Sequence, residues 1–205
     1  MGLVAKETGS GNGFEPISEG IHEAVCYRFF DLGTQFNETF GKSARKVLLM
    51  WEVPEERIEI ERDGETLDLP RAISKQYTLS LHKKANLRHD LESWRGRRFT
   101  ADELQGFDLC NILGASCQLQ VMRETKGEKT YANISNILPC KTKLTPENKS
   151  DYFSFDEHTE LPENTPEWIA GIIAKSEEWK AMKGAPNPGD PEPSYTAEDD
   201  DDVPF

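Results

Sequence analysis

The segment "AISKQYTLSLHKKANLRHDLESWRG", residues 72–96, changes its hydrophobic period part-way along. Apolar and polar side chains alternate over its first ten residues, which is typical of a β-strand with one buried face. Lys75 is the one charged residue on that face. In the rest, large apolar residues recur at helical spacing, namely Leu87, Leu91 and Trp94. Gly96 is well placed to end that helix, so the segment predicts a strand followed by a helix.

Further strand-like runs lie on both sides of this segment. They are short, rich in β-branched and aromatic residues, and bounded by Gly or Pro. The predicted strands are 21–33, 45–54, 72–81, 115–124 and 129–139, with a small hairpin at 57–70 built on Asp63-Gly64. Thr100 and Glu103 form a capping box and predict a second short helix within 99–114.

Five main strands with one helical insertion after the third are the layout of an OB-fold, a small Greek-key barrel. We therefore predict a mainly β fold, a five-stranded OB-fold barrel at residues 17–140, with Trp51 and Trp94 in its core. An open α+β sheet with the same elements is the alternative. A barrel is favoured because it leaves no exposed strand edges.

Three segments flank the predicted barrel. Residues 1–16 are Gly-rich and predict a flexible arm. Residues 141–183 form a polar extension with one amphipathic helix, which would begin at Pro166 after the capping residue Thr165. Residues 184–205 contain five prolines and no core-forming pattern, so we expect a disordered acidic tail.

The composition excludes several functional classes. No apolar run approaches the roughly 20 residues of a membrane span, and no signal peptide is recognisable, so a cytosolic location is expected. The four cysteines are Cys26, Cys110, Cys117 and Cys140; none forms a C-x-x-C pair, and we expect free thiols rather than a metal site. No catalytic constellation or phosphate-binding loop is present, and we predict no enzyme activity and no cofactor.

Charge is distributed unevenly along this acidic chain. The net charge is −13, yet residues 71–100 hold eight basic residues against two acidic ones. Cations interleaved with aromatic rings suit single-stranded nucleic acid, because cations follow the phosphates and rings stack on bases. The candidate DNA contacts are Phe36, Phe40, Arg45, Lys46, Lys75, Tyr77, Lys83, Lys84, Arg88, Arg95, Arg97, Arg98, Arg123, Lys126, Lys129 and Tyr131. For Tyr77, which shares a face with Leu79, a core position is an equally good interpretation.

The chain ends in "DDDDVPF", an acidic run followed by a terminal aromatic residue. Such a peptide suits a partner pocket that is apolar at its base and ringed by Lys or Arg. The candidate partner-binding residues are Asp199, Asp200, Asp201, Asp202, Val203, Pro204 and Phe205. A tail that only improves solubility is the alternative.

Two resemblances point in the same direction. The peptide "DDDDVPF" resembles the acidic tip of bacterial single-stranded-DNA-binding proteins. The pattern "DLGTQ…WEVP…AISKQYTLSLHKKANLRHDLESWRGRRFT…FDL…LG", within residues 20–139, resembles the replication-associated single-stranded-DNA-binding proteins of tailed bacteriophages.

The phage resemblance implies an OB-fold, sequence-tolerant binding of single strands, and recruitment of replication or repair enzymes by the tail. It also implies the cytosol of an infected bacterium. Duplex DNA binding stays open. Two other classes remain as alternatives: an acidic adaptor or DNA mimic without DNA binding of its own, and a nuclease with scattered carboxylates.

Overall fold

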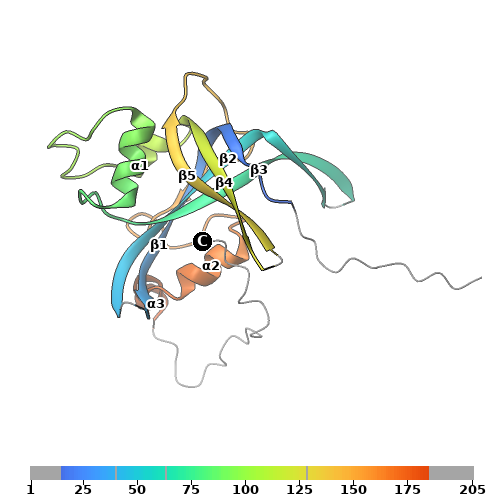
Figure 1. The fold of residues 1–205 in the computed structure, drawn as a ribbon. Helices are drawn as coiled ribbons and strands as arrows, with labels where there is room; N and C mark the ends of the chain where they lie inside the picture. The colour runs from blue at the N-terminus through green and yellow to red at the C-terminus, as the bar shows by residue number, and fades with distance from the viewer. Residues whose placement is uncertain (1–14, 40, 63, 128, 185–205) are drawn as a thin grey trace, which may run out of the picture.

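The computed structural model describes residues 15–39, 41–62, 64–127 and 129–184. The chain is mainly β, as predicted (Figure 1). Its strands are β1 (Gly20–Asn37), β2 (Lys42–Arg62), β3 (Glu65–Thr78), β4 (Ser116–Lys126), β5 (Lys129–Pro139) and β6 (Asp151–Phe153). Its helices are α1 (Asn86–Arg95), the 3-10 helix η1 (Leu109–Ile112), α2 (Glu167–Ala174) and α3 (Glu177–Lys183). Most of the predicted arm and of the predicted tail lies outside the described residues.

The strands form one sheet in the order β3-β2-β1-β4-β5. Neighbours in this order are antiparallel, and β6 adds to β1 in parallel. Within the described part of the chain, no ladder of hydrogen bonds joins the edge strands β3 and β5. The sheet is therefore not closed by backbone pairing.

The first three strands are longer than predicted. Residues 57–70 do not form a separate hairpin but are the far ends of β2 and β3, which stay paired up to Arg62 and Glu65. The register shifts once, between Val53 and Arg57. This irregularity accommodates Pro54, which lacks the N–H that a regular ladder needs, and pairing resumes beyond it.

Helix α1 packs on one face of the sheet, where the main core lies. Leu87, Leu91 and Trp94 are buried as predicted, and Gly96 ends the helix with a φ of 65°. The Trp94 ring lies 5.8 Å from that of Trp51, which is fully buried. Both predicted core tryptophans are therefore confirmed, and their contact packs α1 against β2.

The predicted helix within 99–114 is wrong. The capping-box hydrogen bonds do form between Thr100 and Glu103, but they close only a turn. Phe99 packs edge-on against Phe107 with 5.1 Å between ring centroids, which brings the two ends of the segment together. A helix would hold these rings apart, so tertiary packing overrides the local signal. Only the short η1 follows.

The opposite face of β1 and β2 carries a second core. The extension after β5 covers it, and Figure 1 shows α2 and α3 away from α1, with strands between them. The buried residues of this core are Tyr27, Phe30, Leu32, Leu48, Met50, Phe153, Ile169 and Ile173. This explains why β1 has buried side chains on both of its faces.

The predicted single helix at 166–183 is two helices. Ser176 separates them, because its hydroxyl accepts the N–H of Trp179 and so caps α3. At the other end, Pro166 itself is the residue before the first turn of α2, one position later than the predicted cap Thr165. Trp168, in the first turn of α2, is 45% exposed. Among the described residues, no helix is long and apolar enough to cross a membrane.

Candidate nucleic-acid interface

Helix α1 and the turns on either side of it gather exposed cations. Lys83 and Lys84 lie in the turn that leads from β3 into α1, and Arg98 follows the end of the helix. All three side chains are exposed, and none forms an ion pair with the residues that the structure describes. These are cations that a phosphate backbone would reach without breaking an existing contact.

Two hollows lie near the end of α1. A groove of about 360 Å³ is lined by His89, Glu92, Ser93, Gly96, Arg97 and Arg98. A cleft of about 750 Å³ lies between the end of α1, the segment 103–116 and the end of β5. Arg97 lines both hollows, so together they form one grooved surface around the end of α1. Sequence reasoning found its cations but missed His89 and the cleft, because the cleft depends on how segment 103–116 folds back.

The Arg88 side chain is less available for contact with DNA than the sequence predicts. Its Nε donates to Glu92 Oε1 at 3.0 Å, and its Nη1 donates to the Leu81 carbonyl at 3.3 Å. Glu92 also accepts the Phe99 N–H at 3.2 Å. The Arg88 side chain therefore ties the start of α1 to both flanking turns and has a structural role.

Arg95 and Arg97 both pair with Glu103. The hydrogen bond from Arg97, with further bonds from the Thr100 N–H and Arg95, holds the pKa of Glu103 well below its usual range. Arg97 is still half-exposed, whereas Arg95 is largely covered. The pair adds positive potential to the cleft, and one carboxylate offsets part of it.

Tyr77 and Lys75 lie beneath α1. Tyr77 is only 3% exposed, and its hydroxyl donates to Asp90 Oδ2 at 2.8 Å. The Lys75 Nζ lies 2.8 Å from the same carboxylate oxygen. Burial and the neighbouring carboxylate raise the pKa of Tyr77. Of the two interpretations of Tyr77, this placement favours the core, and it gives Lys75 a buried partner instead of an open phosphate site.

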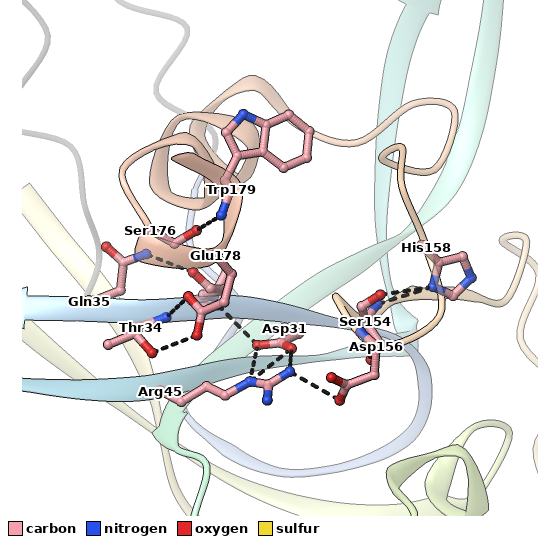
Figure 2. Close-up of polar contacts among 12 residues, drawn as sticks. Asp31, Thr34, Gln35, Arg45, Ser154, Asp156, His158, Ser176, Glu178 and Trp179 are labelled. Atoms are coloured by element: carbon pink, nitrogen blue, oxygen red, sulfur yellow. Dashed lines mark hydrogen bonds and ion pairs between the residues drawn. The ribbon is translucent and has the colours of Figure 1, made fainter. Parts of the chain in front are cut away.

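Arg45 and Lys46 lie near the β1–β2 turn, beside the end of β3. Figure 2 shows the Arg45 guanidinium between Asp31 and Asp156. The Asp31 side chain is 7% exposed, and its hydrogen bond to Arg45 raises the pKa of the arginine further. Lys46 donates to Thr78 Oγ1 at 3.1 Å. Arg45 thus has two protein carboxylates in the positions that phosphates would take.

The β4–β5 turn is a separate basic site. Figure 1 shows it far from α1, at the other end of these strands. Lys126 and Lys129 are exposed there and Tyr131 is half-buried, while Lys126 lies 3.6 Å from Glu124. Arg123 is used differently: its guanidinium donates to backbone carbonyls of residues 16–17, which fixes the start of the described chain.

The aromatic residues predicted near the β1–β2 turn have mixed outcomes. Phe36 is 63% exposed, so its ring is open to a ligand. Phe40 lies outside the described residues. Helix α2 borders the same end of β1, because Gln35 Nε2 donates to the Ile172 carbonyl at 3.0 Å. The predicted partner-binding residues 199–205 also lie outside the described residues.

Glu178 of α3 fixes the C-terminal helices to β1. Its carboxylate accepts the backbone N–H and the hydroxyl of Thr34, both at 2.6 Å (Figure 2). Gly33 allows this approach: its φ is +69°, and an added Cβ would lie 2.6 Å from both the Ser176 Cβ and Glu178 Oε2.

A Gly33→Ala protein is expected to lose the close packing of α3. Alanine at this φ costs roughly 1–2 kcal/mol, and the clash with Ser176 adds to that cost. We expect trypsin to cut faster at Lys175 and Lys180, which are exposed on the released segment. Gly41→Ala is the matched control, since its φ of +57° is also left-handed but nothing lies within 4 Å of the added Cβ. Equal cleavage rates in the two variants would contradict the packing argument.

The same contact predicts an acid-sensitive attachment of α3. Burial alone would raise the pKa of Glu178, but the hydrogen bonds from Thr34 outweigh it and lower the pKa below its ordinary value of 4.5. A lowered pKa gives stability that is complete above pH 4.5 and is lost as the pH falls through the lowered value. Melting temperatures across this acidic range should therefore fall less steeply for Glu178→Gln than for the unmodified protein. Equal slopes of melting temperature against pH for the two proteins would contradict the prediction.

Comparison with known proteins does not place the chain in a family. No family model matches it, and no curated protein matches it.

Proposed function

We propose that this protein binds single-stranded DNA without sequence preference and recruits replication, recombination or repair enzymes through its acidic C-terminal peptide. The observation that carries the proposal is the surface around α1, where the exposed cations Lys83, Lys84 and Arg98 flank the helix and two connected hollows lie at its end. Cations without protein partners are the groups that gain most from phosphate, because binding releases counterions and breaks no ion pair. The phage resemblance of residues 20–139 supports the same function and a bacterial host cytosol.

We also propose that the sheet is a variant of the OB-fold. Its strand order is that of an OB barrel opened between β3 and β5, and α1 follows β3 as the family layout requires. The edge strands β3 and β5 approach to within 8 Å between Cα atoms at several positions. Pairing along that seam would complete the barrel around the main core.

A fluorescence titration of labelled oligo-dT tests DNA binding. The proposal predicts saturable binding. The logarithm of the binding constant should fall linearly with the logarithm of the salt concentration, with a slope of about 0.7 per phosphate neutralised. Mixed-sequence single strands should compete equally well, because stacking and phosphate contacts do not depend on sequence. Absence of binding at low salt would favour the adaptor or DNA-mimic alternative.

Removal of Phe205 alone is expected to abolish enzyme recruitment while DNA affinity hardly moves. The deletion removes the aromatic anchor but keeps the aspartates.

Deletion of residues 198–205 should also tighten DNA binding at low salt, because the carboxylates no longer compete for the same cations. Pull-downs of host replication proteins with each variant measure the first effect. Full recruitment by both variants would leave only the solubility role.

A further inference from the structure

We propose that the cleft beside α1 accepts one unstacked base of the bound single strand. This inference rests on the proposed function and adds to it a defined base-binding site. The cleft holds about 750 Å³, which is within the usual range for small-ligand sites of roughly 300–1,000 Å³. A base with its sugar fits within that volume.

The walls of the cleft have the two properties that a base requires. One part is apolar and partly aromatic, formed by Trp94, Phe107, Ile112, Ala115 and Pro139. The remainder is polar and includes Arg95, Arg97, Glu103, Asp108 and Asn111. A base has apolar faces and an edge that carries both donors and acceptors, so it matches a site of this mixed kind.

Arg95 lines this site and carries one donor without a partner. Its Nη1 is buried and has no hydrogen-bond partner among the residues that the structure describes. A buried donor without an acceptor costs roughly 1–3 kcal/mol, so a site that leaves one open gains when a ligand acceptor arrives. Every base offers such an acceptor on its edge, as a carbonyl oxygen or a ring nitrogen.

The Arg95 guanidinium is also held in place before any ligand arrives. It lies over the Phe99 ring at 4.5 Å and over the Phe107 ring at 5.1 Å from their centroids, and Glu103 holds its other end. A donor fixed by three contacts loses little side-chain entropy when it binds. The Arg95 guanidinium is therefore a fixed part of the cleft wall.

The position of the cleft favours a base of a bound strand over a free small molecule. Arg97 separates the cleft from the groove that Arg98 and His89 line, and exposed Lys141 directly follows Cys140 in the cleft wall. Cations that line or adjoin the cleft suit a polyanion that passes across it, with its phosphates outside and one base inside.

Gly106 allows the cleft to be filled without disturbing its walls. It lines the cleft, its backbone is not left-handed, and an added Cβ would meet nothing within 4 Å. Gly106→Phe adds a ring at the cleft lining, which is expected to compete with the base, and Gly106→Ala is the matched control. Stacking of one base is worth roughly 1–3 kcal/mol, so Gly106→Phe should weaken oligo-dT binding by about 5- to 150-fold. Because no cation changes, the slope of affinity against salt should stay that of the unmodified protein.

The closing experiment measures oligo-dT affinity against salt for the unmodified protein, Gly106→Phe and Gly106→Ala, with circular dichroism to verify folding. Weaker binding by Gly106→Phe alone, with an unchanged salt slope, supports the base site. If the unmodified protein binds and both variants match it, the base site is wrong and the proposed function stands. If both variants are equally weakened, the loss does not come from filling the cleft and the base site is again wrong. If the unmodified protein does not bind, both proposals fail.

Discussion

A protein in which Lys83, Lys84 and Arg98 are all changed to Glu is expected to bind oligo-dT about 100-fold more weakly at about 0.1 M salt. Each lost phosphate contact removes about 0.7 from the slope of log affinity against log salt, which is roughly fivefold at that concentration. Three contacts give the stated loss and make the slope shallower by about 2. The loss should be the same for every single-strand sequence, since phosphates carry no sequence information.

The choice of these three cations follows from their surroundings. Arg88 lies nearby but bonds to Glu92 and to the Leu81 carbonyl, so its reversal would disturb the start of α1 as well as any DNA contact. The control reverses three other exposed lysines, Lys149, Lys175 and Lys180, which makes the same change in net charge away from α1. Equal loss in both triple variants would mean that net charge, and not the α1 surface, governs binding.

Replacing Glu52 by Ala is expected to lower the free energy of unfolding by roughly 3–5 kcal/mol, since each buried donor left without an acceptor costs roughly 1–3 kcal/mol. Glu52 is fully buried on β2. It accepts the N–H groups of Glu147 and Asn148 at 2.8 and 2.9 Å and the Asn148 side-chain amide at 2.7 Å. These bonds fix the chain after β5 against β2, so their loss should also free the extension.

Urea unfolding measures this effect. Glu52→Gln keeps the shape and one acceptor oxygen, and we expect it to fall between the unmodified protein and Glu52→Ala. An unfolding midpoint for Glu52→Ala equal to that of the unmodified protein would show that the extension is held by its apolar contacts alone.

The parts of the fold that were predictable depend on local signals. The period change within 72–96 identified β3 and α1, because a buried strand face and a buried helix stripe leave different spacings in the sequence. Gly96 was recognisable as the helix end because a left-handed residue there is nearly always glycine. The runs of β-branched and aromatic residues at 115–124 and 129–139 likewise identified β4 and β5.

The parts that were not predictable depend on partners distant in sequence. The sequence did not explain why a charged residue, Lys75, lies on a buried strand face. In the structure Lys75 pairs with Asp90, which lies on the helix that packs over the strand. Arg45 was taken for a phosphate contact because nothing in the sequence shows that Asp31 and Asp156 reach it. The cleft at Gly106 was also missed, since the capping box there predicts a helix that tertiary packing prevents.

The central claim is that a single strand lies across the surface around α1. Photo-crosslinking with an oligonucleotide that contains iodouracil tests it most directly, because this base forms adducts mainly with aromatic and histidine side chains in direct contact. Mass spectrometry of the adducts should identify His89 or Phe107, which line the groove and the cleft. Adducts confined to Phe36 or Tyr131, at the ends of the two strand hairpins, would contradict the account and move the DNA path to those turns.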